Sequence, residues 1–263
     1  MDFLHCHIEQ FVPKEFEDSI SQIATFSFDE QKEINLNPGG YFELVFQSGG
    51  FQQKKKSAET WYERPRIFVG GLHSESFAVR PTDHNGTLIS VQFKTGKAKN
   101  FIPDRLNLYK DGTIPLTDIF GADLAKQAEE VFVQNSNMAK VRIIQDLLQK
   151  IHVPKIFSAI DRAVELILEK NGCLAVQDLA YQVHLGPSQF RKRFNEEVGM
   201  SPKAYSKIVR INAIQNALLT GKHSKLTELA YYFDYFDQSH FVRDFKSVIG
   251  WSPKQYLKAL KMK

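Results

Sequence analysis

The chain has few cysteines and no long apolar run, and both absences narrow the class of protein. Only Cys6 and Cys173 among the 263 residues are cysteines, so we expect no disulfide framework and a reducing, cytoplasmic location. No stretch of about 18 uncharged apolar residues occurs, which argues against a membrane span. The segment from Met1 to His5 also lacks the basic start and apolar run of a signal peptide.

Signatures of catalysis and metal binding are missing as well. No nucleophile–base–orienter set, phosphate-cradling glycine loop or paired-carboxylate motif stands out, so we expect neither enzyme activity nor a cofactor. The run His5-Cys6-His7 is one candidate metal cluster, but in an extended segment Cys6 points away from both histidines. His73 and His84 do not supply the missing ligands, so we expect no metal site.

Charge is divided unevenly along the chain, although the net charge is only +4. Residues 1–154 carry 17 basic and 20 acidic side chains, whereas residues 155–263 carry 17 basic and 10 acidic ones, a net charge of +7. A basic half of this kind suits a polyanionic partner, although a surface of solvated lysines would give the same sum.

The first 110 residues are predicted to be rich in β-strands. Short β-branched or aromatic runs occur at residues 41–46, 66–69, 76–80 and 88–93, and turn residues separate them. This punctuation is typical of a small barrel or sandwich. Residues 51–56 are polar and are predicted to form a hairpin tip.

Two helices are predicted next, over residues 116–135 and 136–151. The second carries apolar residues at steps of three and four, namely Met138, Val141, Ile144, Leu148 and Ile151. This stripe could pack on the barrel, or it could pair with the same helix of a second copy and form a homodimer. Val153-Pro154 then interrupts the pattern, so we place a domain boundary between 152 and 155.

The remainder is predicted to be entirely helical. Seven helices are expected, over residues 156–170, 176–183, 187–198, 202–220, 226–233, 238–249 and 253–262. Ser201-Pro202 and Ser252-Pro253 each combine a serine N-cap with a proline in the first helical position. The predicted fold class is therefore two-domain α+β, with a β-rich barrel and trailing helices over 1–152 and an all-α domain over 155–263.

One motif occurs twice in the helical half. The first copy comprises Leu179-Ala180-Tyr181, Phe190, Phe194, Gly199, Ser201-Pro202-Lys203 and Tyr205. The second comprises Leu229-Ala230-Tyr231, Phe241, Phe245, Gly250, Ser252-Pro253-Lys254 and Tyr256. The offset is 50 before the central turn and 51 after it, so one residue is inserted in the second copy.

Each copy has the pattern of a helix-turn-helix unit. The phenylalanines four residues apart share one helical face, and such a stripe is predicted to form the core of the unit. Amide, hydroxyl and cationic side chains gather instead near the start of each second helix and can donate to base edges in a DNA major groove. The candidates for base contact are Ser188, Gln189, Arg191, Lys192, Gln238, Ser239, His240 and Arg243.

Other polar side chains of the repeat are candidates for phosphate contact. Lys203 and Lys254 lie just inside helix N-termini, where free N–H groups also suit phosphates. The other candidates are Arg193, Asn195 and Lys246. The helix over 202–220 is expected to hold the two reading helices on one face of double-stranded DNA, one in each of two successive major-groove segments.

The double motif resembles the DNA-binding domain of AraC/XylS-type transcription regulators. The resemblance covers about residues 155–260 and rests on Gly-x-Ser-Pro-x-x-Tyr, which closes each copy, and on the run from Phe233 to Lys246. It implies that Ser188, Arg191 and Lys192 read bases in one helix and Gln238, Ser239, His240 and Arg243 in the other. A glycine commonly precedes the second recognition turn in this family, whereas Asp234 and Tyr235 occupy that stretch here.

The N-terminal half resembles the cupin-like domain of some regulators of this family, through residues 38–46, 65–71 and 79–81. The resemblance implies a sensory or dimerisation role and names no ligand; RNA polymerase would be a further partner. Six aromatic residues could line an effector pocket or simply fill the barrel: Phe42, Phe46, Trp61, Phe68, Phe77 and Phe93. The open alternatives are an enzyme or DNA-repair-type protein localised by the helices, and a helical module that binds proteins.

Overall fold

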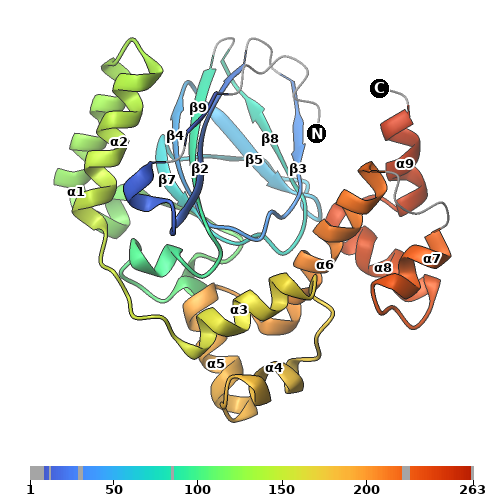
Figure 1. Ribbon diagram of the computed structural model, residues 1–263. Coiled ribbons are helices and arrows are strands. Elements are labelled where there is room, and N and C mark those ends of the chain that lie inside the picture. Colours follow the sequence, from blue (N-terminus) through green and yellow to red (C-terminus); the bar gives the residue numbers. More distant parts are fainter. Residues whose placement is uncertain (1–8, 12, 29–31, 84–85, 221–225, 262–263) are drawn as a thin grey trace.

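The N-terminal part of the protein is a sandwich of two antiparallel sheets (Figure 1). The computed structural model describes residues 9–11, 13–28, 32–83, 86–220 and 226–261. The larger sheet has the order β1-β2-β9-β4-β7-β10 and the smaller sheet β3-β8-β5-β6. The strands are β1 (Glu9–Phe11), β2 (Ile20–Phe28), β3 (Ile34–Leu36), β4 (Glu43–Ser48), β5 (Phe51–Lys55), β6 (Tyr62–Glu63), β7 (Ile67–Gly70), β8 (Phe77–Pro81), β9 (Gly86–Phe93) and β10 (Thr113–Pro115).

The larger sheet is covered on both faces, and side chains of one strand alternate between them. Along β9, Ser90 and Gln92 line the space between the two sheets. Val91 and Phe93 point to the opposite face and belong to the main hydrophobic core. This alternation has the period of two that a strand imposes. Strands β2, β4 and β9 therefore contribute both to the main core and to the space between the sheets.

The prediction of a polar hairpin tip over residues 51–56 is wrong. Phe51–Lys55 is strand β5, which pairs with β6 and β8 in the smaller sheet. The side chain of Phe51 is packed against Phe77 and Val79, and Gln53, two residues further along the same face, is also buried. The turn lies just before the strand, where Gly49 adopts a positive φ of 86°.

Two helices, α1 (Leu116–Glu129) and α2 (Asn137–Ile151), cover the outer face of the larger sheet (Figure 1). Helix α1 is kinked at Gly121, and α2 begins at the Ser136 N-cap, whose hydroxyl accepts a hydrogen bond from the N–H of Ala139. Ile144 and Leu148 of the predicted stripe are fully buried within the chain. These two residues therefore pack within the chain, whereas Met138 of the same stripe is 80% exposed.

Seven helices follow in the described part of the chain, as predicted. They are α3 (Ala159–Glu169), α4 (Val176–Gln182), α5 (Pro187–Val198), α6 (Pro202–Leu219), α7 (Leu226–Tyr232), α8 (Gln238–Ile249) and α9 (Pro253–Lys261). The start of α3 differs from the prediction, because Ser158 and Asp161 form a capping box there and Ile156 remains 93% exposed. None of the helices in the described ranges is long and apolar enough to cross a membrane.

The helical half packs directly on the sandwich. Gly199, which ends α5 in a left-handed conformation, lies so close to the ring of Phe42 that a Cβ would sit 2.8 Å from it. The N–H of Ser76 donates to the carbonyl of Val248, and the Asn212 amide donates to the carbonyl of Pro38. Both ends of the helical half are thus in contact with the β-sandwich.

Two hydrophobic cores divide α6 between them. The larger core runs from the sandwich through α3 and α5 and includes Tyr205 and Ile208 in the first half of α6. The smaller core includes Ile211 and Ile214, further along α6, together with residues of α7 and α8. One helix therefore belongs to both cores.

Candidate nucleic-acid interface and cavity

The first helix-turn-helix unit is α4, a short turn and α5. Leu179 and Ala180 of α4 and the two α5 phenylalanines, Phe190 and Phe194, are almost completely buried. The rings of Phe190 and Phe194 pack edge to face with their centroids 5.6 Å apart. The aromatic stripe is therefore core, as predicted, and leaves the other side of α5 facing solvent.

The second unit, α7 and α8, repeats this arrangement. Leu229, Ala230, Phe241 and Phe245 are at most 2% exposed, and the two phenylalanine rings are again edge to face, 6.0 Å apart. The two units lie at opposite ends of α6 (Figure 1). Helix α6 therefore connects the two units, and its role in holding both reading helices on one face of DNA stays a prediction.

The turns of the two units begin with the same backbone geometry, and in neither is the left-handed residue a glycine. His184 and Asp234 adopt left-handed conformations, with φ of 54° and 55°. Histidine and aspartate are among the non-glycine residues that enter this region more readily. The N–H of the next residue donates to an alanine carbonyl in the preceding helix. Leu185 donates to Ala180 and Tyr235 donates to Ala230, each over 3.0 Å. The presence of Asp234 where the family commonly has glycine therefore leaves this hydrogen bond and the left-handed conformation in place.

The eight residues predicted to contact bases are all exposed at the starts of α5 and α8. They are Ser188, Gln189, Arg191, Lys192, Gln238, Ser239, His240 and Arg243. Helix α8 is capped by the Asp237 side chain, which accepts a hydrogen bond from the N–H of His240. Helix α5 has Gly186 at the same place, with no side-chain cap. The two helices therefore differ at their N-termini, where only α8 has a side-chain cap.

The predicted phosphate contacts are placed less uniformly. Lys203, Lys246 and Lys254 are exposed. Arg193 is half-buried and donates through Nε and Nη2 to the Glu197 carboxylate, 3.0 and 2.9 Å away. Asn195 is also half-buried, and its carbonyl accepts the N–H that ends α5. Three of the five side chains are thus presented to solvent, while Arg193 is engaged within the chain.

Acidic groups near the reading helices are paired with cations of the same chain. Glu196 of α5 lies 3.1 Å from Arg105 of the N-terminal half, and Asp244 of α8 lies 3.9 Å from Lys207 of α6. The imidazole of His240 is 3.7 Å from the Asp244 carboxylate. These pairs reduce the repulsion that unpaired carboxylates would exert on a polyanion.

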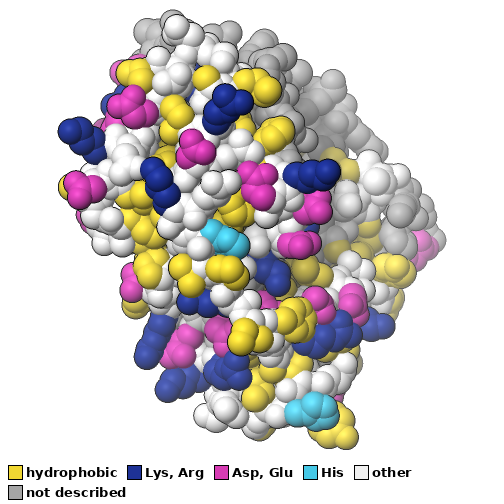
Figure 2. Space-filling model, turned by 60° about the vertical axis from the view of Figure 1, so that its left-hand side comes forward, with side chains coloured by type: hydrophobic (Ala, Val, Ile, Leu, Met, Phe, Trp, Pro, Cys, Tyr) yellow, Lys and Arg dark blue, Asp and Glu magenta, His cyan; other side chains and the backbone are white. Residues whose placement is uncertain are grey.

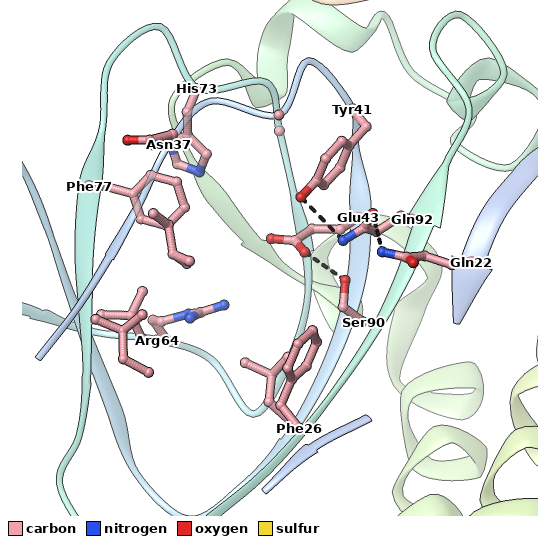
Figure 3. A pocket seen from close by; sticks show the side chains of 16 residues that line it. Gln22, Phe26, Asn37, Tyr41, Glu43, Arg64, His73, Phe77, Ser90 and Gln92 are labelled. Carbon is pink, nitrogen blue, oxygen red and sulfur yellow. Dashed lines mark hydrogen bonds between the residues drawn. The ribbon is translucent and has the colours of Figure 1, made fainter. Parts of the chain in front are cut away.

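A cavity of about 430 Å³ lies between the two sheets (Figure 3). One part of its wall is apolar and includes Phe26, Phe77, Val79 and Leu88. Its mixed lining of apolar side chains and a few polar groups is typical of a small-molecule site.

Arg64 is the charged group that most distinguishes the cavity. Its side chain points toward the interior (Figure 3), the residue is 8% exposed, and Nε and Nη1 have no hydrogen-bond partner. The guanidinium lies over the ring of Phe68, 4.5 Å from its centroid. Burial lowers the pKa of Arg64 to about 10, although Glu43 opposes that shift, so the group remains cationic at neutral pH. An unpaired buried cation is costly unless something binds it.

The other polar groups of the wall bond mainly to one another. Ser90 donates to Glu43 over 2.7 Å, and the Gln92 amide donates to the hydroxyl of Tyr41 over 3.2 Å. His73 stacks on Phe77, with ring centroids 4.0 Å apart. Burial lowers the pKa of His73 to about 4, so its imidazole is neutral near pH 7. Arg64 is therefore the cationic residue of the cavity wall whose N–H donors lack hydrogen-bond partners.

The cavity lining differs from the predicted one. Of the six aromatic residues proposed for a pocket, Phe77 lines this cavity. Phe42, Phe46 and Phe93 belong to the main core, because strand alternation directs them to the other face of the larger sheet. Phe68 lies beneath the Arg64 guanidinium, and Trp61 is covered by the cations of Lys54 and Arg80.

Sequence reasoning missed the polar lining residues. Arg64, Glu43, Tyr41 and Gln92 stand among strands, and the sequence carried no signal that they meet in one interior. Of the candidate metal ligands, His5, Cys6, His7 and His84 lie outside the described residues. Among the residues that are described, no group of three His, Cys, Asp or Glu side chains could hold a metal ion.

Comparison with known proteins defines the class of the helical half. Residues 179–259 match the family model described as "Helix-turn-helix domain". This segment of the chain is similar to that helix-turn-helix family and contains both copies of the double motif described above. A search of curated protein sequences finds no significant match to the chain.

Among solved structures, the chain is similar to ToxT from Vibrio cholerae. A structure of ToxT matches with a TM-score of 0.51 and 15% identity, over 91% of this chain and 98% of that chain. A ToxT structure with a bound unsaturated fatty acid matches with a TM-score of 0.46 and 14% identity, over 91% and 95% of the two chains. The C-terminal domain of AraT, a response regulator from Geobacillus stearothermophilus, matches with a TM-score of 0.37 and 22% identity, over 40% and 88%. The likeness to ToxT shows that the β-sandwich followed by helices is a shared fold.

Proposed function

We propose that the protein is a sequence-specific DNA-binding transcription regulator that places α5 and α8 in successive major-groove segments. The observation that supports this proposal is the repetition of the helix-turn-helix unit. Two units with the same turn and core each expose amide, hydroxyl and guanidinium groups at the start of the second helix. Such groups at that place can read base edges. The helix-turn-helix match favours this function over an enzyme or a protein-binding module.

Selection of bound duplexes from a random library tests the proposal directly. We expect enrichment of one sequence with two conserved segments, and a logarithm of the binding constant that falls linearly with the logarithm of salt concentration. A library that shows no enrichment, or binding that does not respond to salt, would contradict it. The variant Arg142→Ala is a suitable control, because this exposed cation lies on α2, which is not part of the proposed DNA-binding surface.

We further propose that the cavity of the N-terminal domain binds an effector with one anionic group and an apolar body. The unsatisfied Nε and Nη1 of Arg64 support the anionic group, and Phe26, Phe77 and Leu88 support the apolar part. Glu43 lies across the cavity from Arg64 (Figure 3) and would repel a second acidic group. Residues at the cavity mouth adjoin the helical half, since Asn212 of α6 donates to Pro38 and Gly39 beside the lining residue Asn37. This contact is a route by which an effector could influence DNA binding.

A series of straight-chain carboxylates and the matching alcohols tests this second proposal. We expect the carboxylates, and not the alcohols, to raise the melting temperature of the protein in proportion to their binding. The variant Arg64→Met should abolish the difference between the two series. Equal responses to acid and alcohol would contradict the anionic specificity.

We also propose dimerisation through the helix over 136–151, by residues of its exposed surface in place of the buried stripe. The stripe is largely buried, so a second copy would contact residues that remain exposed near the α1–α2 turn, such as Val133 and Met138, which are 68% and 80% exposed. Figure 2 brings this side of the molecule forward and shows basic and acidic side chains interspersed across it. Sedimentation equilibrium of the protein and of Met138→Lys tests the proposal, and a monomer at all concentrations would contradict it.

A further inference from the structure

The residue inserted in the second copy of the repeat can be identified from the structure. The two units agree through the turn, where Leu185 and Tyr235 make equivalent hydrogen bonds to Ala180 and Ala230. The reading helices then start from their N-caps, Gly186 and Asp237. Nothing separates Leu185 from Gly186, whereas Phe236 separates Tyr235 from Asp237. Phe236 is therefore the additional residue.

Phe236 is unusual because its side chain is not part of the hydrophobic core of the second unit. Its side chain is 90% exposed, while the adjacent Phe233 and Tyr235 are 3% and 2% exposed. An aromatic ring exposed to this degree forgoes the stabilisation that burial of its apolar surface would give. Deletion of Phe236 would restore the length of the first turn, so the geometry of the turn does not require it.

The position of Phe236 favours DNA as its partner. It immediately precedes the cap of α8, and residues at the N-terminal end of a recognition helix approach base edges. The nearest residues of α8, Gln238 and Ser239, are polar and exposed, and Arg243 follows one turn later. Polar and cationic neighbours of this kind favour a polyanionic partner that offers one apolar group in its groove. They do not favour a partner protein with an apolar surface. The apolar feature of the major groove is the methyl group of thymine.

We propose that Phe236 contacts the methyl group of a thymine in the segment of DNA read by α8. This inference rests on the proposed DNA-binding function and assigns a reading role to the inserted residue. The first unit has Gly186 directly before α5 and no side chain to make an equivalent contact. A thymine preference is therefore expected beside the α8 segment and has no counterpart beside the α5 segment.

Replacement of single thymines by deoxyuridine tests the contact, because it removes the methyl group alone. The full chain is titrated with the selected duplex, and each thymine is replaced in turn. At one position in the α8 segment we expect the affinity to fall about three- to fivefold, the effect of one methyl group removed from an apolar contact. Phe236→Ala should bind the unmodified duplex with the same reduced affinity and should not respond to deoxyuridine at that position.

A matched control separates this contact from a general effect of exposed aromatics. Tyr231→Ala removes another exposed ring of the same unit, on α7, and should retain the response to deoxyuridine. A wild-type protein that is indifferent to every replacement, or a Phe236→Ala variant that still responds, overturns the inference while sequence-specific binding stands. A chain that enriches no sequence and binds no selected duplex overturns the inference and the proposed function together.

Discussion

The ammonium group of Lys99 lies 2.7 Å from the carboxylate of Asp161, and this ion pair joins the two halves of the protein. Lys99 belongs to the short 3-10 helix η2 (Ala98–Asn100) that follows the sandwich, and Asp161 belongs to the first turn of α3. The same ammonium group is 3.1 Å from Glu197 of α5. One cation therefore holds carboxylates from two helices of the DNA-binding half.

Loss of Lys99 should destabilise the protein strongly. In Lys99→Met, the nearly buried Asp161 carboxylate loses its closest cation, and we expect the free energy of unfolding to fall by about 3 kcal/mol. Denaturant unfolding measures the change. The double variant Lys99→Met/Asp161→Asn should recover much of the loss, because it removes the uncompensated charge. A double variant no more stable than the single one would show that packing of the Lys99 stem dominates.

The two reading helices should make comparable energetic contributions with different salt dependence. Lys192→Ala and Arg243→Ala should each weaken binding to the selected duplex by about 1–3 kcal/mol. Replacing Arg191 and Lys192 together should also lower the salt slope, because each cation that enters the groove displaces counterions from the DNA in addition to making its base contact. Changes at Gln238 and Ser239 should alter sequence preference and leave the slope unchanged. Fluorescence anisotropy over a range of salt concentrations measures both quantities, with Arg142→Ala as control. Equal slopes for all variants would contradict this division of roles.

Arg64→Met should leave the ligand-free protein at least as stable as the wild type. The substitution replaces a buried guanidinium with two unsatisfied nitrogens by an apolar side chain of similar length. The melting temperature without ligand should therefore be unchanged or higher, and the stabilisation by carboxylates should disappear. A marked loss of stability without ligand would instead assign Arg64 a structural role, through its contact with Phe68.

Acid titration should show two separate windows of instability. Burial, together with the nearby cations Arg64 and Lys55, lowers the pKa of His73 to about 4, and Asp111 only partly opposes this. Because the pKa of an unfolded histidine is about 6.5, stability is fully present above that value and falls as the pH drops toward 4. His73→Gln should weaken the pH dependence between these limits. A wild-type stability that is flat between pH 6.5 and 4 would contradict the prediction.

The second window belongs to Asp161. Burial raises the pKa of this carboxyl, but hydrogen bonds from Lys99 and Ser158 outweigh that effect and hold the pKa below its usual value. Its contribution is therefore present above an unfolded pKa of about 3.9 and is lost as the pH falls below it. Asp161→Asn should reduce the pH dependence in this lower range and leave the His73 window unchanged. Urea unfolding at a series of pH values measures both windows.

The helical half could be predicted closely because local signals define it. Helices α5 and α8 have the predicted bounds, since Pro187 and the Asp237 cap fix their starts and left-handed Gly199 and Gly250 fix their ends. These signals lie within a few residues of the boundary that they set. The predicted exposure of the residues at the helix starts followed from the same periodicity.

The sandwich was predicted less well because its strands depend on distant partners. The sequence analysis predicts no strand at β2, although Ile20 and Ile23 are fully or almost fully buried in the main core. Both faces of the larger sheet are covered, so alternation alone could not tell which aromatic residues face the cavity. By residue type Phe46 and Phe93 could either line a pocket or fill the interior, and the strand register directs both to the core. The position of Arg64 depends on tertiary contacts that leave no local pattern.

The sharing of α6 between two cores has a consequence for how the protein unfolds. A division of cores at the middle of a helix sets a cooperative boundary there, between Ile208 and Ile211, and not at the domain boundary predicted between 152 and 155. The first reading unit should then lose its structure together with the sandwich, while the second can open by itself. In amide hydrogen exchange, protection of α5 would follow that of the β-strands, and α8 would exchange earlier. In the proposed regulator, α5 would then be as rigid as the β-sandwich, and α8 would be free to move toward its half of the DNA site.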